Sequence, residues 1–324
     1  MALLLTRHDV TRLVDMTAAL EAVETAFRQQ GAGSAVNEPR QRVRQPQGIL
    51  HLMGAALPEL GYWGFKAYTT TRQGAHFLVS LYDTASGQLL ALIEANTLGQ
   101  LRTGAASGIA TKFCARPDAS RLGLFGSGFQ AEAQLAAIAA VRPLTEVHVY
   151  SRTPEHREHV AQTMSSRLGL TVSPVAIPRD AVAGCDIVTT ITSSREPLFD
   201  GRWLAPGTHI NAAGSNALIR AEVDTTTIAR TDRIFVDDKQ QARIESGELL
   251  AAYERNQLNW QRVRELGDAV SGLVPARGGP DEITLFASQG IALWDIALAA
   301  CVYERARDEG VGQEIALFDA TGAG

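Results

Sequence analysis

Short apolar runs alternate with longer helical stretches from about residue 121 to residue 240. The β-rich runs occupy residues 121–126, 145–151, 170–177, 185–192, 208–214 and 233–238. An alanine-rich stretch at 130–141 and a charged amphipathic stretch at 153–169 fill the first two intervals, and both are predicted to be helices. Strands and helices that alternate at this spacing are typical of an α/β, doubly wound parallel sheet of the Rossmann type.

The pattern before residue 116 is different. An amphipathic helix is predicted at 16–33, where glycine ends the apolar periodicity. Residues 40–56, 62–70 and 75–95 then read as β-strands joined by turns, with a hairpin turn at 84–88. These segments predict an antiparallel α+β part. The last periodic stretch, 281–310, predicts a long apolar helix with a strand-like beginning.

Composition limits the classes of function. The chain has 324 residues, 45% hydrophobic and 20% charged, which suits a globular enzyme of two domains. A net charge of −5 provides no field to attract nucleic acid or an anionic membrane. The start, MALLLTRHDV, meets charge too early for a signal peptide, and no run reaches the roughly 18 apolar residues of a membrane helix. Cys114, Cys185 and Cys301 lack metal-ligand spacing, so we expect a reduced, cytoplasmic protein without a bound metal.

A glycine loop follows the first strand of the α/β part. Gly126-Ser127-Gly128-Phe129-Gln130-Ala131 matches the pattern G-x-G-x-x-A. Gly126 permits a tight turn, Gly128 lets backbone N–H groups approach a pyrophosphate, and Ala131 lets the helix pack close to the strand. The helix N-terminus then presents its partial positive charge to the phosphates. We therefore predict a dinucleotide site at Gly126, Ser127, Gly128, Phe129 and Gln130.

The end of the second α/β strand indicates which dinucleotide binds. An NAD site usually has Asp or Glu there to bind the ribose 2′-hydroxyl. This strand ends instead in Ser151-Arg152-Thr153. A guanidinium between two hydroxyls would hold a 2′-phosphate through charge-assisted hydrogen bonds. The sequence therefore favours NADP(H) over NAD(H), although such a site can accept both.

Four segments in order along the chain carry a family resemblance. They are GFKAYTTT at 64–71, LGQLRTGAASGIATKFCARPDA at 98–119, HINAAGSN at 209–216 and DEITLFASQGIA at 281–292. Together they resemble the ornithine cyclodeaminase/mu-crystallin family. The resemblance implies a substrate-binding and dimerisation domain, residues 1–116 plus 290–324, around a Rossmann domain at 117–289. It also implies a homodimer, to which we assign the β-rich first third and the apolar final helix.

The resemblance further implies a site for a small α-amino or α-imino acid. Arg40, Lys66 and Arg102 match the positions that grip the substrate carboxylate, a task suited to convergent cations and a fork-shaped guanidinium. The alternative for Arg102 is a cation at the start of a helix without a ligand, and we favour the carboxylate contact because a helix N-terminus disfavours positive charge unless an anion is present. The resemblance also predicts Gln289 and Gly290 at the substrate, and Thr192, Asn211, Ala212 and Ala213 at the cofactor.

Two departures from the family pattern bear on the reaction. Asn216 stands where cyclodeaminases carry a catalytic aspartate, and an amide cannot take a proton as a carboxylate can. Lys66 or water would then supply the one proton that imine reduction needs, while Asn216 would hydrogen-bond the imine nitrogen. His51 replaces a glutamate near the amino end of ornithine, and a histidine would not attract a second ammonium group.

These features predict an NAD(P)H-dependent reductase of a small α-imino acid. The substrate would be a cyclic ketimine such as Δ1-pyrroline-2-carboxylate or an acyclic imino acid. A deaminating enzyme of the cyclodeaminase type and a non-enzymatic, dinucleotide-dependent binding protein of the mu-crystallin type remain alternatives.

Overall fold

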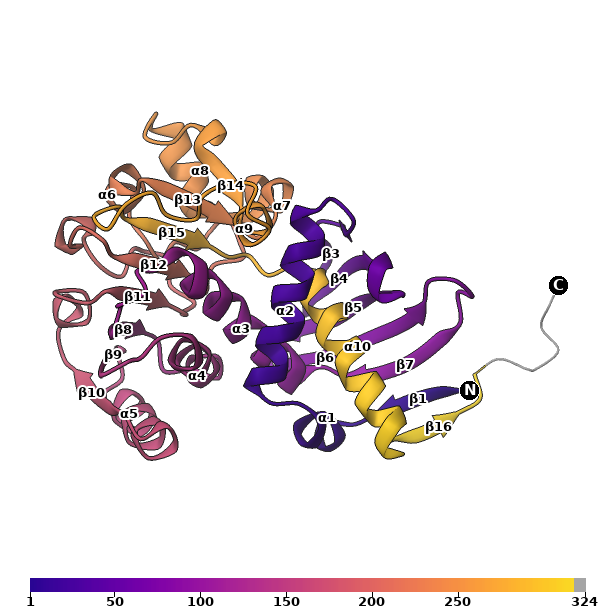
Figure 1. Ribbon diagram of the computed structural model, residues 1–324. Helices are drawn as coiled ribbons and strands as arrows, with labels where there is room; N and C mark the ends of the chain where they lie inside the picture. The colour runs from indigo at the N-terminus through magenta and orange to yellow at the C-terminus, as the bar shows by residue number, and fades with distance from the viewer. Residues whose placement is uncertain (318–324) are drawn as a thin grey trace. The chain divides into compact units, whose positions relative to one another are not determined.

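The computed structural model describes residues 1–317, which form two compact units (Figure 1). Unit 1 comprises Met1–Arg102 and the chain from Ile291 onward, and unit 2 comprises Thr103–Gly290. The chain passes from unit 1 into unit 2 inside helix α3 (Asn96–Cys114). The sequence predicts a boundary after residue 116 and a return of the chain to the first domain at residue 290. Residues 318–324, which belong to that predicted domain, lie outside the described residues.

Unit 1 is built on a mixed sheet. Its strands are β1 (Ala2–Leu5), β2 (Val36–Asn37), β3 (Gln41–Gln45), β4 (Gly48–Leu57), β5 (Tyr62–Thr71), β6 (Gly74–Asp83), β7 (Leu89–Glu94) and β16 (Gln313–Ile315). The order is β16-β1-β7-β6-β5-β4-β2, with β3 also paired to β4. Every pairing is antiparallel except that of β1 with β7. The expected hairpin turn joins β6 and β7, whereas β1, β2 and β16 were not predicted.

Helices cover one face of this sheet. They are α1 (Arg7–Leu13), α2 (Met16–Gly31) and α10 (Ala292–Glu309), with the short η1 (Pro58–Leu60) before β5. Figure 1 shows α2 and α10 lying side by side, and the rings of Phe27 and Trp294 meet at 5.3 Å. Asp15 caps α2 by accepting a hydrogen bond from Ala18 N at 2.9 Å. The buried apolar residues of α10 extend around most of the helix because α2 and the sheet lie against it.

The other face of the sheet is apolar and exposed in the single chain. Strand register places Trp63 opposite Tyr82, Leu78 opposite Ala67, and Val43 opposite Leu50. The exposed fractions are 59% for Val43, 47% for Trp63, 39% for Leu78, and 37% for both Leu50 and Phe65. We call these five side chains the apolar sheet face, since exposed apolar side chains gathered on one face of a sheet are typical of an interaction surface.

Unit 2 contains a parallel sheet. Its strands are β8 (Arg121–Phe125), β9 (Glu146–Tyr150), β10 (Thr171–Val175), β11 (Ile187–Thr190), β12 (His209–Ala212), β13 (Arg233–Val236), β14 (Val263–Glu265) and β15 (Thr284–Ala287). The order is β10-β9-β8-β11-β12-β15-β13-β14 with all pairings parallel. The six predicted strands are confirmed. β14 was missed, and β15, expected only as a lead-in to the last helix, lies between β12 and β13.

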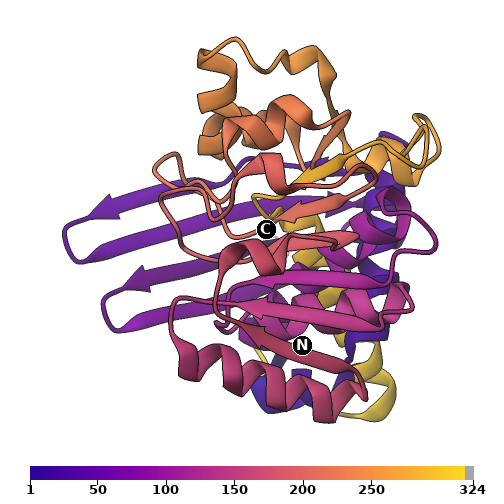
Figure 2. The ribbon, with the colours of Figure 1, turned by 90° about the vertical axis from the view of Figure 1, so that its left-hand side faces the viewer.

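Helical segments connect these strands. They are α4 (Ala131–Val141), α5 (Pro154–Leu168), α6 (Thr225–Arg230), α7 (Lys239–Glu245), α8 (Gly247–Glu254), α9 (Leu266–Val270), η2 (Pro178–Ala181), η3 (Gly201–Trp203) and η4 (Trp260–Arg262). In Figure 2, α5 lies along β10 at one edge of the sheet. Within residues 1–317, no helix combines the length and apolar character needed to cross a membrane.

The strand order reverses between β8 and β11. From β8 the chain proceeds outward to β9 and β10, and then it returns to β11 and continues through β12 on the other side. Ligands of open parallel sheets bind outside the carboxyl ends of the strands at such a switch point. The loops that follow β8 and β11 are therefore the parts of unit 2 where a ligand is expected.

Candidate active site

Unit 1 contains a buried ion cluster formed by Lys66 of β5, Arg102 of α3 and Asp295 of α10. Lys66 Nζ lies 3.0 Å from Asp295 Oδ1, and Arg102 Nε lies 3.1 Å from the same oxygen. The side chains are 2%, 10% and 0% exposed, in that order. One carboxylate thus faces two cations in a place where water is largely excluded. Buried charges persist only when they are paired, so the three groups hold three elements of unit 1 together.

The surroundings of Lys66 change its acidity. Burial, followed by the neighbouring charge of Arg102, lowers the pKa of Lys66 to about 8, although Asp295 opposes the shift. The ammonium group also lies 5.5 Å from the ring centre of Tyr68 and 5.2 Å from that of Phe77. Lys66 is therefore charged at neutral pH, yet it can exchange a proton with a bound molecule more readily than an exposed lysine can.

Part of the hydrogen-bonding capacity of the cluster is unused. Asp295 Oδ2 is buried without a hydrogen-bond partner in the described part of the chain. Arg102 binds Asp295 through Nε and lies over the Trp294 ring, 5.7 Å from its centre. Because a buried polar atom without a partner is costly, these groups are poised to bind a small polar molecule.

Arg40, which directly precedes β3, and His51 of β4 extend the site. Arg40 is 7% exposed, and its Nε lies 3.3 Å from the sulfur of Met53, whose strand partner is Lys66. His51 stacks on Tyr68 with ring centres 4.1 Å apart and planes 2° from parallel. Unit 1 thus contains all four predicted clamp and specificity residues, Arg40, His51, Lys66 and Arg102.

His51 is neutral. Burial, followed by the charges of Arg42, Arg40, Arg44 and Lys66, lowers its pKa to about 4. Nε2 of His51 lies 3.1 Å from the Thr70 hydroxyl, whereas Nδ1 is buried with no hydrogen-bond partner among residues 1–317. His51 therefore brings no charge of its own to the site.

Arg102 lies inside helix α3. The helix begins at Asn96, so Arg102 is in its second turn and the alternative of a cation at the helix start does not hold. Its charge is compensated by Asp295, a residue that sequence reasoning missed. A signal was present, since Asp295 is the lone charged residue in the apolar run GIALWDIALAACV. A carboxylate in such a run is buried on any helical face and therefore requires a cationic partner.

The predicted phosphate loop of unit 2 has the geometry of its motif. Gly126 adopts a φ of 122° and donates a backbone hydrogen bond of 2.9 Å to the Tyr150 carbonyl. A Cβ at this position would lie 2.5 Å from the Ile191 carbonyl oxygen, so the turn requires glycine. A Cβ at Gly128 would meet no atom within 4 Å, which leaves open space before helix α4. The residues present therefore fit a dinucleotide pyrophosphate, with Ser127, Phe129 and Gln130 completing the loop.

Ser151, Arg152 and Thr153 follow β9 directly. The Ser151 hydroxyl donates to the Thr153 carbonyl at 2.9 Å, and α5 begins at the next residue. Arg152 is exposed. Because Tyr150 accepts the hydrogen bond from Gly126, this segment adjoins the phosphate loop, and its side chains can reach the ribose of a dinucleotide bound there.

A buried carboxylate, Glu222, joins the loops after β11 and β12. Its Oε1 accepts hydrogen bonds from Thr192 N at 2.5 Å and from the Thr192 hydroxyl at 2.7 Å. Its Oε2 accepts from Gly214 N at 2.6 Å and from the Thr190 hydroxyl at 2.9 Å. Thr192 was predicted at the cofactor, whereas Glu222 was not predicted. No local sequence signal marks Glu222, because its four donors come from other elements.

A second buried carboxylate lies behind the first. Glu248 Oε2 accepts a hydrogen bond of 2.9 Å from the backbone N–H of Glu222. Burial, followed by the charge of Glu222, raises the pKa of Glu248 to about 8, and burial also raises the pKa of Glu222. Two adjacent buried carboxyl groups therefore share the interior beneath the cofactor loops.

Predicted residues at the end of β12 have different environments. The Asn211 side chain donates to the hydroxyls of Thr111 at 2.9 Å and Thr189 at 3.3 Å, and Ala212 lies in the core. These two side chains face the interior of unit 2, and their backbone groups remain available to a cofactor as predicted positions. Ala213 and Asn216 lie partly buried in the following loop.

The loop of Gln289 and Gly290 is held by another buried carboxylate. Asp237 Oδ2 accepts backbone hydrogen bonds from Gln289 at 2.8 Å and from Gly290 at 2.6 Å. Gly290 adopts a φ of 78°, a conformation that favours glycine. Asp237 thereby fixes the backbone of both predicted residues immediately before the chain returns to unit 1.

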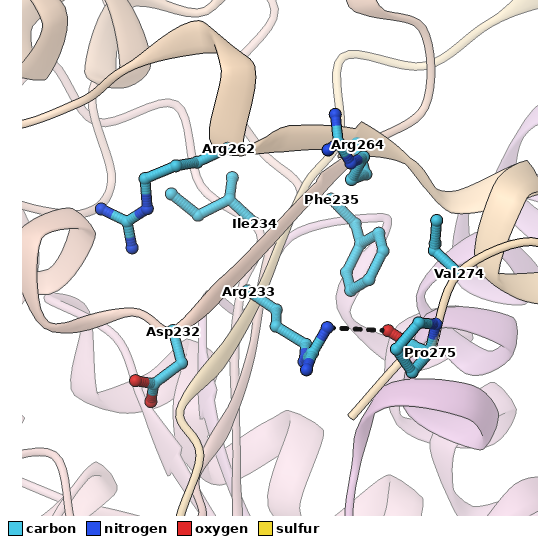
Figure 3. A pocket seen from close by; sticks show the side chains of 8 residues that line it. All are labelled: Asp232, Arg233, Ile234, Phe235, Arg262, Arg264, Val274 and Pro275. Carbon is cyan, nitrogen blue, oxygen red and sulfur yellow. Dashed lines mark hydrogen bonds between the residues drawn. The ribbon is translucent and has the colours of Figure 1, made fainter. Parts of the chain in front are cut away.

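A separate hollow lies beside β13 and β14 (Figure 3). It is lined by Asp232, Arg233, Ile234, Phe235, Arg262, Arg264, Val274 and Pro275. Arg233 binds Glu282 at 2.7 Å and the Pro275 carbonyl at 3.2 Å, and Arg262 binds the Thr231 carbonyl at 2.7 Å. These arginines serve the structure of unit 2, and none of the predicted site residues lines the hollow.

Comparison with known proteins assigns these features to one family. The model of the ornithine cyclodeaminase/mu-crystallin family matches residues 1–310. An alanine dehydrogenase from Archaeoglobus fulgidus is 34% identical over 98% of both chains. A Δ1-pyrroline-2-carboxylate reductase from Bacillus cereus is 32% identical over 97% of this chain and 99% of its own. An iminosuccinate reductase from Paracoccus denitrificans is 32% identical over 97% of this chain and its whole length.

Solved structures agree with the sequence relatives. The Δ1-pyrroline-2-carboxylate reductase of Thermococcus litoralis, in complex with NADH and L-proline, has a TM-score of 0.92 and 32% identity, over 97% of this chain and all of its own. An archaeal alanine dehydrogenase dimer with bound NAD also has a TM-score of 0.92, with 34% identity over 98% of this chain and 99% of its own.

The pair of buried carboxyl groups predicts a pH-dependent stability. Because the pKa of Glu248 is higher in the folded chain than its ordinary 4.5, the folded state holds a proton that the unfolded state releases. The stability from this group is present below pH 4.5 and is lost as the pH rises through about 8. Glu248→Gln mimics the protonated form, so it should melt a few degrees above wild type at about pH 8 and like wild type at about pH 5.

Melting temperatures measured across this pH range test the prediction. Glu254→Gln is the matched control, because Glu254 is exposed on the same helix and should leave the profile unchanged. Parallel profiles for wild type and Glu248→Gln would show that Glu248 does not hold the extra proton.

Proposed function

We propose that this chain, which belongs to the ornithine cyclodeaminase/mu-crystallin family, is an NAD(P)H-dependent oxidoreductase that reduces a small α-imino acid to the L-amino acid. The relatives named above act on imino or amino acids by their names, and two of the solved neighbours hold NADH or NAD. The dinucleotide loop and the cationic cluster of the chain itself support the same reaction.

The observation that carries the proposal is the buried ion cluster. Lys66 and Arg102 are two buried cations that share a single carboxylate oxygen of Asp295. Arg40, directly before β3, adds a third buried cation. A substrate carboxylate would supply the missing negative charge, and the Arg102 guanidinium can bind it in a fork-like manner. Holding the acid group at two or three points fixes the adjacent imine carbon in one orientation.

The roles of the residues follow from this placement. A bound reduced nicotinamide supplies the hydride that adds to the imine carbon. Arg40 and Arg102 bind and orient the carboxylate. Lys66 holds the same carboxylate and is placed to give a proton to the imine nitrogen, for which its lowered pKa is suited. Asn216 would hydrogen-bond the imine nitrogen, and Asp295 keeps the two cations together when no substrate is bound.

Asn216 favours reduction over cyclodeamination. Cyclodeamination requires a base at this position to remove a proton from the substrate amine, and an amide cannot act as that base. The neutral, buried His51 likewise gives no anionic partner to the second ammonium group of a diamino acid. Both features disfavour ornithine as the substrate.

We propose NADP(H) as the preferred cofactor, with NAD(H) accepted. Arg152 is exposed after β9, between two hydroxyl residues, and no carboxylate stands at this strand end to bind a ribose 2′-hydroxyl. The solved relatives contain NADH or NAD, so the proposal of NADP(H) rests on Arg152 of this chain and not on the relatives.

We also propose that the protein is a homodimer built by unit 1. The apolar sheet face leaves large side chains such as Trp63 and Phe65 exposed in the single chain. The sequence predicts that helix α10 takes part in the interface. In the structure its apolar residues are buried against the rest of unit 1. The proposal therefore rests on the sheet.

A substrate panel tests the reaction. With NADPH or NADH, imines formed from α-keto acids and ammonium, and Δ1-pyrroline-2-carboxylate, should be reduced with net oxidation of the cofactor. L-Ornithine with a catalytic amount of oxidised cofactor should give neither ammonia nor proline at a useful rate.

Asn216→Ala should lower imine reduction by about 10- to 100-fold, as one hydrogen bond to a charged group is lost. Robust proline formation would instead show that another residue supplies the base.

The clamp is tested by removing its cations. Lys66→Met and Arg102→Gln should each lower kcat/KM by at least about 100-fold, because the carboxylate and the carbon beside it lose their alignment. Dinucleotide binding, measured by fluorescence titration, should change little. In wild type, kcat/KM should fall as the pH rises through about 8, where Lys66 loses its proton. Arg307→Gln, at an exposed position of α10, is the control, and near-normal kcat/KM in either clamp variant would make that residue structural.

Cofactor choice is tested at Arg152. Arg152→Ala should lower kcat/KM with NADPH by about 10- to 100-fold, the value of one charge-assisted contact to phosphate, and should leave the NADH reaction nearly unchanged. Arg167→Ala, an exposed arginine at the other end of α5, should alter neither reaction. A wild-type preference for NADH would contradict the assignment.

The interface is tested by light scattering at micromolar concentration. Wild type should be a dimer, and Phe65→Lys should shift it toward monomer because a charge would be buried at the contact. Leu273→Lys replaces a 66% exposed leucine of unit 2 and should leave the dimer intact. Persistence of the dimer in Phe65→Lys would exclude the apolar sheet face as its centre.

A further inference from the structure

Asn216 stands in an irregular loop whose two ends are joined by one side chain. Residues 214–222 follow β12, and we call them the Asn216 loop. At its beginning, the backbone N–H of Gly214 donates a hydrogen bond of 2.6 Å to Oε2 of Glu222, the residue at its end. A bond across the base of a loop restricts the residues between its ends, so the backbone that carries Asn216 has a defined course.

The interior of the Asn216 loop is held as well. The Ser215 hydroxyl donates to the Arg220 carbonyl at 3.2 Å. A Cβ at Gly247 would collide with the carbonyl oxygens of Leu218 and Arg220, so the first residue of α8 lies directly against the loop. The loop is therefore both tied at its base and packed against a helix.

The second oxygen of Glu222 holds a different loop. Oε1 accepts hydrogen bonds from Thr192 N at 2.5 Å and from the Thr192 hydroxyl at 2.7 Å. Thr192 lies just after β11, and a Cβ at Gly214 would collide with its backbone. The two loops thus touch each other, and a single carboxylate bonds to both of them.

The loop after β11 in turn adjoins the phosphate loop. A Cβ at Gly126 would lie 2.5 Å from the carbonyl oxygen of Ile191, the residue before Thr192. Contacts therefore run from the glycine turn of the dinucleotide site through Ile191 and Thr192 to Glu222, and from there to the Asn216 loop. A dinucleotide seated at Gly126 and the amide of Asn216 would be placed by one connected set of groups.

This connection requires a carboxylate. Each oxygen of Glu222 accepts one backbone N–H and one hydroxyl, from Thr192 at Oε1 and from Gly214 and Thr190 at Oε2. An ionised carboxylate offers two accepting positions on each oxygen, and all four are used. An amide would replace one oxygen by an NH2 group, which would face a backbone N–H and repel it. Only the carboxylate can hold both loops at once.

We propose that Glu222 is the positioning residue that places Asn216 relative to the bound dinucleotide. The inference rests on the proposed imine reduction, in which a hydrogen bond from Asn216 helps only if the imine carbon also meets the nicotinamide. Glu222 acts through the Asn216 loop and the loop of Thr192, and not on the reacting atoms. Glu248 of α8 fixes the backbone of Glu222 in turn, by accepting its N–H at 2.9 Å.

A double-mutant cycle tests the inference at saturating cofactor. The substrates are Δ1-pyrroline-2-carboxylate and the imine of pyruvate with ammonium. Glu222→Gln should lower kcat/KM by about 10- to 100-fold, because one of the two loops loses its acceptor. In the Asn216→Ala background the same change should cost less than about 3-fold, since no amide is left to place. Glu196→Gln, an exposed carboxylate in the loop after β11, is the control and should leave both values unchanged.

Independent losses would overturn the inference. If the effects of Glu222→Gln and Asn216→Ala multiply in the double variant, Glu222 does not act through Asn216. A general weakening of the fold would give that result, so the cycle separates positioning from a purely structural role. Near-normal kcat/KM in Glu222→Gln would equally reject it.

Dinucleotide binding provides a readout that needs no turnover. In a fluorescence titration with NADPH, Glu222→Gln should raise Kd by about 10-fold, because the loop of Thr192 is no longer fixed beside the phosphate loop. An unchanged Kd would overturn the inference. Absence of turnover with every imine in wild type would instead reject the proposed function, and the NADPH titration would still decide the role of Glu222.

A milder variant covers the case in which Glu222→Gln does not fold. Thr190→Val keeps the volume of the side chain and removes one hydroxyl donor from Oε2 of Glu222. It should lower kcat/KM by about 3- to 10-fold, and this loss should again shrink in the Asn216→Ala background. A Thr190→Val variant whose loss is the same in both backgrounds would contradict the proposed role of Glu222.

Discussion

The ion pairs of Asp295 are the constraint on which unit 1 depends. A carboxylate inside an apolar helix cannot remain charged without partners, and its partners come from a strand and from another helix. Packing α10 against the sheet therefore requires Lys66 and Arg102 to enter the interior at the same place. The cations of the proposed site are held there by a resident anion, so the packing of unit 1 brings them together. Cations already fixed in place would need no rearrangement when an acid binds, which offsets part of the cost of burying three charges.

Unit 2 uses buried carboxylates for a related purpose. A parallel sheet provides the switch point, but the loops beyond its strand ends have no ladder hydrogen bonds of their own. Glu222 supplies acceptors for two loops, and Asp237 supplies them for the loop at Gly290. Each carboxylate satisfies backbone N–H groups that irregular structure leaves unpaired, and the loops therefore have defined positions. Burying a charged carboxylate destabilises the folded state. Glu248, which accepts a hydrogen bond from the backbone of Glu222, adds a second buried carboxyl group to this part of unit 2.

The parallel sheet and the glycine loop could be predicted from local sequence patterns, whereas features that depend on contacts between distant residues could not. Alternating strands and helices, together with the glycine loop at Gly126, predicted the parallel sheet because these signals lie in adjacent residues. The position of β15 between β12 and β13 depends on which edges remain open in three dimensions, and no local signal reports it. Asn211 was assigned to the cofactor by the family resemblance. Which way its side chain points depends on its place in β12, and in the structure it donates hydrogen bonds to Thr111 and Thr189. Asp295 and Glu222 were missed because their partners are remote in sequence.

The sign and placement of charge in unit 1 connect the fold with the choice of substrate. A resident carboxylate that is shared between Lys66 and Arg102 balances only part of their charge, and the remainder would attract the acid group of the proposed substrate. His51, whose pKa is lowered by burial and by nearby arginines, stays neutral and offers no negative charge to a second ammonium group. Within the proposed function, selectivity between mono- and diamino acids would then depend on the charge at position 51, and a carboxylate in place of His51 would favour the diamino acid.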